Sequence, residues 1–336
     1  MKNKEIAELL QISPATVSLA INNKPGVSEE TRRKVLALRD GESAGNATRQ
    51  KSSKRKIVEV LIYDFHSSML SNVEFSMNLI KYFSNRLDQN SYQMSISFVA
   101  ASNIRDKIQM INESDVAGAL FLATIMPEDV AEEIQKIIRK PCVFVDAFYK
   151  ALNVDAVLMD NFSGVRLAVD YAVQKGHREI GYLDSSHSMK NFEDRFSEFC
   201  ISMEKNKIPI NKDYIFKLYF LEKDATEDMR RILSRHPKLP TVFIAGNDFI
   251  AVGAYNALKE AGYRIPEDVS LIGFDDNKKA RELETPLTSL RIRQLEIANA
   301  AVDRLIAKIE RPEENSYSIR QFISVDLVER ESVRTL

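Results

Sequence analysis

The feature that most constrains the fold of this 336-residue chain is a regular alternation, from Ile57 onward, of short apolar runs with helix-length amphipathic segments. The apolar runs read VEVLIY, MSISFV, GALFLA, CVFVD, EIGYLD, TVFIAG and VSLIGF. Strands that alternate with helices are typical of a parallel sheet covered by helices. We therefore predict an α/β fold, and the roughly 280 residues involved are enough for two α/β lobes.

One helix of this region can be placed in detail. Its apolar residues recur at helical spacing between Ser163 and Lys175, and Gly176 is suited to the position just after a helix end. The predicted buried face consists of Val165, Ala168, Val169, Ala172 and Val173.

The N-terminal segment from Lys4 to Leu38 has helical spacing throughout and fits three short helices. Ser13 followed by Pro14 predicts the start of the second helix, and Ser28 followed by two glutamates predicts the start of the third. Residues 40–56, DGESAGNATRQKSSKRK, contain almost no large apolar side chain. This segment is therefore predicted to be a linker.

Charge is distributed unevenly along the chain. Residues 1–56 contain twelve Lys or Arg and six Asp or Glu, so this segment carries +6 and the remainder carries −7 of the total of −1. A small basic module on a larger acidic body is expected for a phosphate-binding headpiece attached to a small-molecule sensor. A solubilising basic tail is the alternative.

Signals for secretion, membrane insertion, metals and cofactors are weak or absent in the sequence. Charges interrupt the N-terminal run MKNKEIAELL, and no segment offers 18 consecutive apolar residues, so we expect a cytoplasmic protein with no membrane partner. Cys142 and Cys200 are too few and too far apart for a disulfide framework or a zinc site. We expect two reduced, partly buried thiols and no cofactor or metal.

The run from Ile6 to Leu36, IAELLQISPATVSLAINNKPGVSEETRRKVL, closely resembles the helix-turn-helix headpiece of the LacI/GalR family of transcriptional regulators. The resemblance implies that the helix beginning at Pro14 lies in the major groove of double-stranded operator DNA. The residues at the implied DNA-contacting positions are Ser13, Pro14, Ala15, Thr16, Ser18, Leu19 and Asn22. Many family members carry a polar or basic residue at the position of Leu19, so readout here is expected to use apolar contact with a thymine methyl. For the polar residues, ordinary solvated helix surface is the alternative.

Two later stretches are similar to the effector domain of the same family, and RESV near the C-terminus resembles its usual ending. The stretches are DNFSGVRLAVDYAVQKGHREIGYL and AGNDFIAVGAYNALKEAGYRIPEDVSLIGFDDNKKARELETPLTSL. The resemblance implies a homodimer and a fold like that of periplasmic sugar-binding proteins, with two lobes joined by three crossing strands. The expected limits are 1–39 for the headpiece, 40–56 for the linker and 57–336 for the effector and dimerisation domain. Within that domain we expect one lobe at about 57–159 and 292–320, and the other at about 160–291 and 321–336.

Polar residues at the ends of the predicted strands mark a candidate ligand site, because ligands of open α/β sheets bind beyond the carboxyl ends of the strands. Asp146 ends one apolar run, Asn247 follows another and Asp275 follows a third. The resemblance adds Arg195 as a ligand contact. Carboxylates, an amide and a guanidinium suit the hydroxyls of a sugar. For the pairs Asp275-Asp276 and Asn247-Asp248, helix capping or turn formation is the alternative.

The apolar face of a sugar usually stacks on an aromatic ring, and Phe75, Tyr219 and Phe220 are the candidates. Plain core packing is the alternative for each of them. His177 follows a helix-ending glycine and resembles a family position with a structural role, so we expect no catalysis from it.

The sequence thus predicts a dimeric, sequence-specific transcriptional repressor controlled by a small molecule, with a sugar as the expected effector. Two alternatives share the pocket: a cytoplasmic sugar-binding protein without gene regulation, and a sugar-processing enzyme. No recognisable catalytic motif is present, so an enzyme is not expected.

The linker departs most from the family pattern, in which a segment resembling YxPNxxARSL forms a hinge helix and a leucine wedges into the minor groove. Here the segment is about three residues shorter by our alignment, and it offers Asn46, Ala47, Thr48 and Arg49 but no leucine. We therefore expect little operator bending, with basic residues following the phosphates instead. Those residues are Lys51, Lys54, Arg55 and Lys56.

Overall fold

The computed structural model describes residues 6–7, 10, 12–22, 24–39, 55–63 and 73–336. The chain divides into two units, Met1–Arg55 and Lys56–Leu336, and each is described by itself. No helix in the described ranges is long and apolar enough to span a membrane.

The first unit is helical. Ile6 and Ala7 lie in a helical segment, followed by α2 (Pro14–Ile21) and α3 (Glu29–Arg39). The hydroxyl of Ser13 accepts a hydrogen bond from the backbone N–H of Thr16, and that of Ser28 accepts one from the N–H of Thr31. The predicted starts of the second and third helices are therefore confirmed. The small buried core consists of Ile6, Ala7, Val17, Ala20 and Val35.

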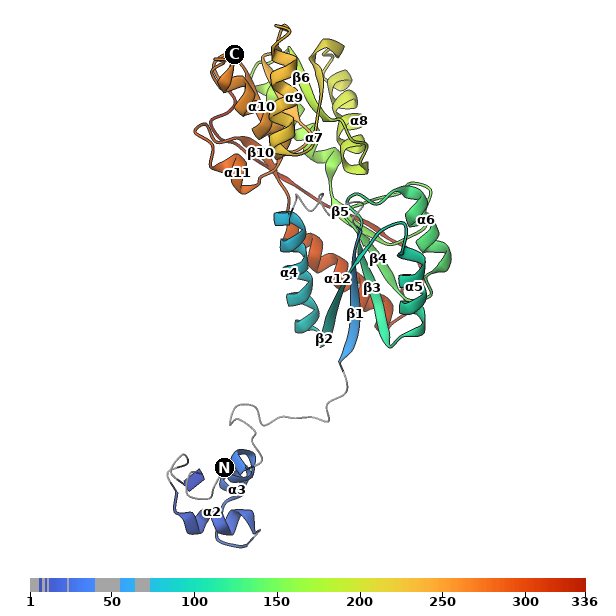
Figure 1. The fold of residues 1–336 in the computed structure, drawn as a ribbon, viewed down its shortest axis with the longest axis vertical. Helices are drawn as coiled ribbons and strands as arrows, with labels where there is room; N and C mark the ends of the chain where they lie inside the picture. The colour runs from blue at the N-terminus through green and yellow to red at the C-terminus, as the bar shows by residue number, and fades with distance from the viewer. Residues whose placement is uncertain (1–5, 8–9, 11, 23, 40–54, 64–72) are drawn as a thin grey trace. The chain divides into compact units, whose positions relative to one another are not determined.

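The second unit contains two six-stranded sheets, one in each lobe (Figure 1). The first has the order β11-β5-β4-β3-β1-β2, and all its neighbouring strands are parallel. Its strands are β1 (Lys56–Tyr63), β2 (Tyr92–Val99), β3 (Val116–Leu122), β4 (Cys142–Val145), β5 (Ala156–Met159) and β11 (Arg320–Ile323). The central strands are buried, as the apolar runs predicted.

The second sheet has the order β12-β10-β9-β8-β6-β7, with only β12 antiparallel to its neighbour. Its strands are β6 (Ile180–Ser185), β7 (Ile215–Leu218), β8 (Val242–Ala245), β9 (Ser270–Asp275), β10 (Thr288–Arg291) and β12 (Asp326–Val328). All seven predicted apolar runs therefore form strands, and the two-lobed parallel α/β fold is confirmed.

Helices cover both faces of each sheet (Figure 1). The first sheet is packed by α4 (Val73–Gln89) and α12 (Gln294–Glu310) on one face and by α5 (Ile104–Glu113) and α6 (Glu128–Ile137) on the other. The second is packed by α7 (Asn161–Gln174) and α8 (Lys190–Lys205) on one face and by α9 (Glu222–Leu233) and α10 (Asp248–Glu260) on the other. Two shorter elements, the 3₁₀ helix Lys212–Tyr214 and α11 (Lys278–Arg281), lie in connections.

Helix α7 follows the sequence prediction closely. It ends at Gln174, and Gly176 has a φ of +96°, the left-handed conformation expected after a helix end. Four of the five residues of the predicted face are buried, and Val173 is partly buried against the same core.

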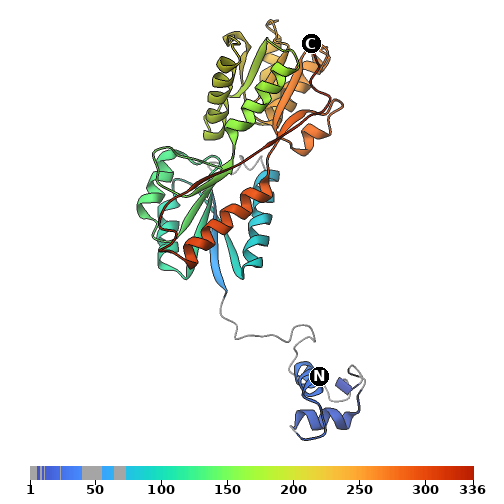
Figure 2. The same ribbon diagram turned by 180° about the vertical axis from the view of Figure 1, so that it is seen from behind.

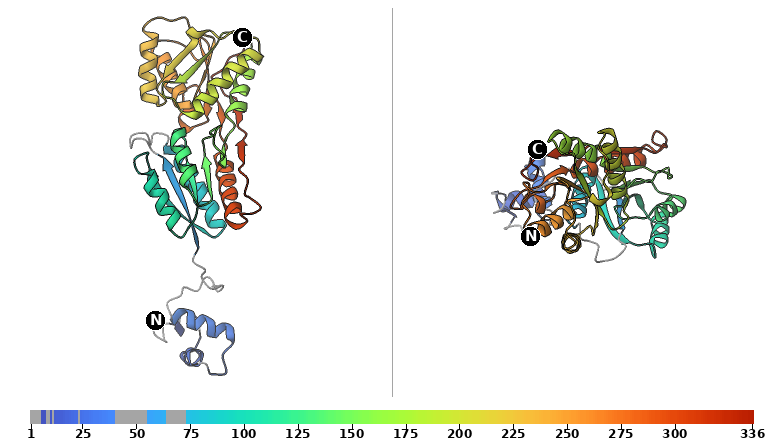
Figure 3. Two further views of the ribbon diagram at one scale, coloured as in Figure 1. Left: turned by 90° about the vertical axis from the view of Figure 1, so that its right-hand side faces the viewer. Right: turned by 90° about the horizontal axis from the view of Figure 1, so that it is seen from above.

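The chain passes between the two lobes three times, between β5 and α7, between β10 and α12, and between β11 and β12 (Figures 2 and 3). Strand β11 pairs with β5 along its whole length, from Arg320 opposite Ala156 to Ile323 opposite Met159. The third crossing therefore follows Ile323, a few residues later than the sequence analysis placed it. Both cysteines are free and partly buried, as expected.

Gly273 in β9 provides a first testable point, because a Cβ there would lie 2.0 Å from Oδ1 of the buried Asp248. That carboxylate accepts hydrogen bonds from the Ser289 hydroxyl (2.7 Å) and the Asn277 N–H (2.7 Å). Gly273→Ala should therefore lower the free energy of unfolding by about 1–3 kcal/mol, measured by urea denaturation. In an Asp248→Ala background the same change should cost much less, and equal costs in both backgrounds would contradict this explanation.

Candidate functional site

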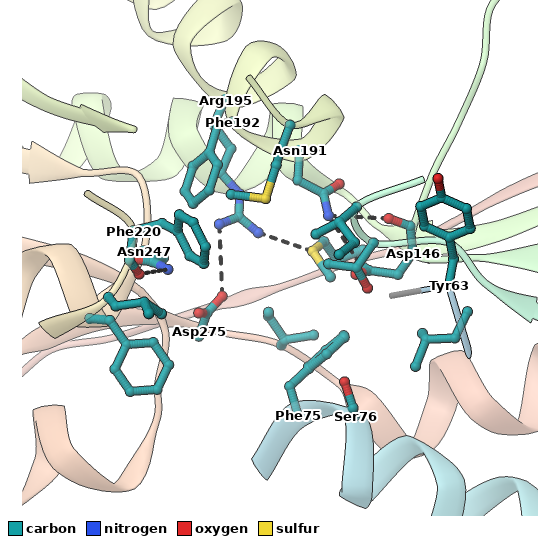
Figure 4. A pocket seen from close by; sticks show the side chains of 18 of the residues that line it. Tyr63, Phe75, Ser76, Asp146, Asn191, Phe192, Arg195, Phe220, Asn247 and Asp275 are labelled. Carbon is teal, nitrogen blue, oxygen red and sulfur yellow. Dashed lines mark hydrogen bonds and ion pairs between the residues drawn. The ribbon is translucent and has the colours of Figure 1, made fainter. Parts of the chain in front are cut away.

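A pocket of about 110 Å³ lies between the two lobes, at the carboxyl ends of their strands. Six of the seven predicted effector residues line it, and Figure 4 shows their side chains directed toward the same space. They are Asp146, Arg195, Asn247, Asp275, Phe75 and Phe220. The seventh, Tyr219, is not among the lining residues. Its ring stacks on Phe220 at a centroid distance of 4.6 Å and meets His187 edge-on at 4.6 Å.

Asp146 follows β4 in the first lobe. Its backbone has a φ of +68°, which is uncommon for a residue other than glycine, and its side chain is buried. The amide of Asn191 donates to the Asp146 carbonyl oxygen (3.1 Å) and to its Oδ1 (3.2 Å). Burial raises the pKa of Asp146 to about 6, against the opposing effects of Thr124, Arg195 and Asn191.

Asp275 is the last residue of β9 in the second lobe, and its φ of +121° is also strained. Its carboxylate lies 3.8 Å from Nη1 of Arg195 and accepts no hydrogen bond from any described residue. Burial raises the pKa of Asp275 well above its usual value; Asp248 and Asp146 raise it further, while Arg195 lowers it. The pocket thus contains a largely buried carboxylate, 13% exposed, that lacks a hydrogen-bond donor of its own among these residues.

Arg195 projects from α8 and is almost fully buried. Its Nε donates to Asn161 Oδ1 (2.8 Å), its Nη1 donates to the Gly246 carbonyl oxygen (2.6 Å), and its guanidinium carbon lies 3.7 Å from the centroid of the Phe274 ring. These contacts hold the guanidinium in one orientation. Because a guanidinium has five N–H groups, donors remain for a ligand.

Two asparagines that the sequence analysis missed connect the charged residues of the two lobes. Asn161 accepts from Arg195 and donates to Asn191 Oδ1 (2.8 Å), and Asn191 in turn donates to Asp146 (Figure 4). Both asparagines are buried. A continuous hydrogen-bonded chain therefore runs from Arg195 in the second lobe to Asp146 in the first. The predicted strands signalled neither residue: Asn161 follows β5, which was not among the predicted apolar runs, and Asn191 lies in helix α8.

In the pairs Asn247-Asp248 and Asp275-Asp276, some side chains form structural contacts and others face the pocket. Asn247 lines the pocket, but its Oδ1 also caps α10 by accepting from the N–H of Ile250 (2.8 Å). Asp276, beside Asp275, pairs with Arg291 Nε (2.7 Å) and Arg330 Nη2 (2.5 Å). Asn247 therefore both caps a helix and lines the pocket. In the pair Asp275-Asp276, Asp276 forms the structural ion pairs and Asp275 faces the pocket.

Aromatic side chains reach the pocket from both lobes. Phe75 comes from α4, and Phe220 follows β7 (Figure 4). Phe192 and Phe249 also line the pocket and were missed, since neither lies at a strand end. An apolar ring face combined with several polar side chains suits a sugar or a heterocycle.

His177 lies outside the pocket lining. Its two ring nitrogens contact the Thr241 hydroxyl (2.8 Å) and the Arg334 carbonyl oxygen (3.0 Å), and burial lowers its pKa. Both nitrogens are occupied by structural partners, in agreement with the structural role expected for this residue. Within the described ranges, no group of three or more His, Cys, Asp or Glu side chains is arranged to hold a metal ion.

The predicted DNA-contacting residues lie on and around α2 in the first unit. Pro14, Ala15, Ser18 and Asn22 are exposed, and Leu19 is 37% exposed. Ser13 is also exposed, while Thr16 is partly buried and its hydroxyl lies 2.8 Å from that of Ser13. The predicted residues therefore belong mainly to the accessible side of α2, whereas Val17 and Ala20 fill the core.

Arg32 of α3 contributes to the positive charge of the first unit and also forms structural contacts. Its guanidinium donates to the carbonyl oxygens of Ala20 (Nη1, 3.2 Å) and Lys24 (Nη2, 2.8 Å), with a longer contact to Leu19 O (3.4 Å). Arg32 therefore ties α3 to the C-terminal end of α2.

These features define a class of protein: a two-lobed α/β ligand-binding unit that follows a small helical unit with the helix-turn-helix arrangement. Residues 3–39 match the family described as bacterial regulatory proteins, lacI family, and residues 169–333 match the periplasmic binding protein-like domain. The chain belongs to the LacI family of bacterial regulatory proteins.

Curated relatives align over nearly the whole chain. The ribose operon repressor of Haemophilus influenzae is 27% identical, with 99% of this chain and 98% of the relative covered. The HTH-type transcriptional repressor PurR of Escherichia coli O139:H28 is 29% identical, with 98% and 96% covered.

Solved structures support the same fold. The Lac repressor dimer bound to operator and the anti-inducer ONPF gives a TM-score of 0.76 at 21% identity, covering 99% of both chains. A LacI family regulator from Enterococcus faecium with bound ribose gives 0.69 at 22% identity, covering 84% of this chain and 100% of that one.

Proposed function

We propose that this protein is a cytoplasmic transcriptional repressor whose binding to operator DNA is controlled by a sugar held between its two lobes. The observation that carries the proposal is the presence, in one chain, of an accessible helix-turn-helix unit and a buried pocket lined by two carboxylates and a guanidinium. The relatives named above are repressors, which supports regulation over catalysis.

The pocket chemistry supports a sugar as the effector. Asp146 and Asp275 offer acceptors, Arg195 and Asn247 offer donors, and phenylalanine rings offer apolar faces. One relative is named as a ribose operon repressor, and one structural neighbour contains bound ribose. Since Asp146 and Asp275 belong to opposite lobes, a ligand that binds both would favour the closed arrangement, which gives it a differential effect on two conformations.

The proposal is tested by measuring DNA binding and ligand binding on the same full-length protein. Selection from a random duplex pool should enrich a pseudo-palindromic site, because two headpieces of a dimer read two half-sites. Fluorescence anisotropy on that duplex should then change when the sugar identified by thermal shift is added. Absence of any sequence preference over random DNA would contradict the repressor function, and a DNA-binding protein indifferent to every sugar would contradict the proposed effector.

The proposed homodimer has a candidate surface on β2, which is an edge strand of the first sheet. Ile96 and Phe98 lie on one face of this strand and are 41% and 59% exposed, and Met77 on the adjacent helix α4 is 55% exposed. Large apolar side chains gathered on an unpaired edge are unusual for a monomer. A second copy of the chain, as in the Lac repressor dimer, would cover them.

Phe98→Lys should weaken dimerisation at least tenfold, because a charge would be buried in the interface. Phe322→Lys is the matched control, since Phe322 is 39% exposed on β11, the opposite edge of the same sheet. In sedimentation velocity over a concentration series, Phe98→Lys should be monomeric and Phe322→Lys should remain dimeric. Dissociation of the Phe322→Lys protein with retention of the Phe98→Lys dimer would place the interface at the other edge.

The linker prediction concerns residues 40–56, of which 40–54 lie outside the described residues. We propose that the operator is bent little, because the segment offers no leucine to wedge between base pairs. Energy transfer between dyes at the two DNA ends should change little on binding of the natural protein and should increase for Thr48→Leu. A sharp kink with the natural protein would contradict the prediction.

A further inference from the structure

We infer that the pocket takes an unphosphorylated sugar of monosaccharide size and rejects the phosphate ester of the same sugar. This inference rests on the proposed function and adds the charge and the size of the effector.

The charge of the pocket lining is unfavourable to an anion. Asp146 and Asp275 line it from opposite lobes, and Arg195 is the one Lys or Arg among the lining residues that the structure describes. When both carboxylates are ionised, this set carries a net charge of −1. A sugar phosphate would add two negative charges to it.

The single cation is already engaged. Arg195 donates to Asn161 and to the Gly246 carbonyl oxygen, and it faces Asp275 at 3.8 Å. A phosphate needs several charge-assisted donors to offset its loss of hydration. The N-terminus of α10, which could supply such donors beside the pocket, has its Ile250 N–H capped by Asn247. The pocket therefore offers a phosphate only the remaining N–H groups of one arginine, which also faces Asp275.

The carboxylates of the pocket can accept further hydrogen bonds, and the ligand has to supply the donors. The Asp275 carboxylate accepts no hydrogen bond from any described residue, and Asp146 accepts from Asn191 (3.2 Å) and Thr124. Neutral hydroxyls can donate to these carboxylates and also accept from the remaining N–H groups of Arg195. A hydroxyl therefore satisfies both sets of groups, whereas an ionised phosphate group in the same place can only accept.

The size of the pocket limits the ligand to one ring. A cavity of about 150 Å³ is known to hold a single benzene molecule, and the pocket here measures about 110 Å³, so even one sugar ring requires the lining side chains to shift. Phe75 and Phe220 border it from opposite lobes, so a second ring would have to displace them much further. We therefore expect a monosaccharide to bind with a small adjustment of the lining and a disaccharide to be excluded.

The test uses isothermal titration of the full-length protein with a panel of unphosphorylated aldopentoses and aldohexoses, their phosphate esters, and cellobiose. At least one free monosaccharide should bind, with its phosphate ester bound at least 100-fold more weakly and cellobiose not bound. A phosphate ester that binds as tightly as its parent sugar, or tight binding of cellobiose, would overturn the inference. Failure of every free monosaccharide to bind would overturn it as well.

A charge variant separates electrostatic rejection from simple lack of space. Asp275→Asn removes one negative charge with little change in volume, so it should bind the free sugar at least tenfold more weakly but discriminate less strongly against the ester. Unchanged discrimination would mean that charge is not what excludes the phosphate. The DNA-binding measurement distinguishes the two levels of argument: a sugar phosphate that alters operator binding would leave the proposed regulation standing and overturn only this inference.

Discussion

Replacing Asp275 by asparagine or alanine should lower the affinity for the effector sugar at least tenfold and 100-fold, respectively, without lowering the stability of the unliganded protein. The ligand would lose hydrogen bonds to a charged acceptor, each worth about 1.5–3 kcal/mol. The free protein would lose a largely buried carboxylate that has no hydrogen-bond donor among the described residues. Titration calorimetry gives the affinity, and urea denaturation gives the stability.

The neighbouring Asp276 is the matched control, because it has the opposite environment. Its carboxylate is buried and pairs with Arg291 and Arg330. Asp276→Asn should lower the free energy of unfolding, by about 1–3 kcal/mol, because it leaves those guanidinium groups without their charged partner. If Asp275→Asn instead destabilised the protein as strongly as Asp276→Asn, the assignment of Asp275 to ligand binding would be wrong.

The same carboxylates make sugar binding depend on pH. The pKa of Asp146 is raised to about 6 and that of Asp275 is raised well above its usual value, both mainly by burial. In the free protein, the stability that Asp146 contributes is therefore present below its unfolded pKa and is lost as the pH rises through about 6. Ligand hydroxyls that donate to an ionised carboxylate lower its pKa. Affinity should consequently fall by up to about tenfold per pH unit below pH 6. Asp275→Asn should make this dependence shallower.

The sequence predicted seven strands from their continuous apolar runs and missed five others, β5, β7, β10, β11 and β12. β11 is only four residues long and mostly exposed, and β12 has three half-buried residues. Neither presents an apolar run from which a strand could be predicted. Their pairing partners, β5 and β10, come from distant parts of the chain, so tertiary contacts decide these strands.

The sequence predicted the pocket residues that follow predicted strands, and it missed others that lie elsewhere. Asp146 and Asp275 follow predicted strands, and both line the pocket. The prediction included both Tyr219 and Phe220, and only Phe220 reaches the lining. The contact of Asn191 with Asp146 depends on how the lobes meet, which no local pattern encodes.

The last prediction concerns the first unit, where the structure gives a basic residue a role that sequence alone did not show. Arg32→Lys preserves the net charge, and hence the long-range attraction to DNA phosphates. A lysine ammonium cannot reproduce the planar fork with which Arg32 binds the carbonyl oxygens of Ala20 and Lys24. We expect the headpiece to lose about 2 kcal/mol of stability, a large share for so small a core.

Operator affinity should fall at least tenfold for this charge-neutral change, because α2 would no longer be held in place. Lys34→Gln is the complementary control: Lys34 is exposed and pairs with Glu30 of the same helix, so its removal should leave the fold intact and at most flatten the salt dependence slightly. Anisotropy titrations of both variants at several salt concentrations, with circular-dichroism melting, would separate the two effects. Normal operator binding by Arg32→Lys would show that the guanidinium contacts are not needed to position the DNA-reading helix.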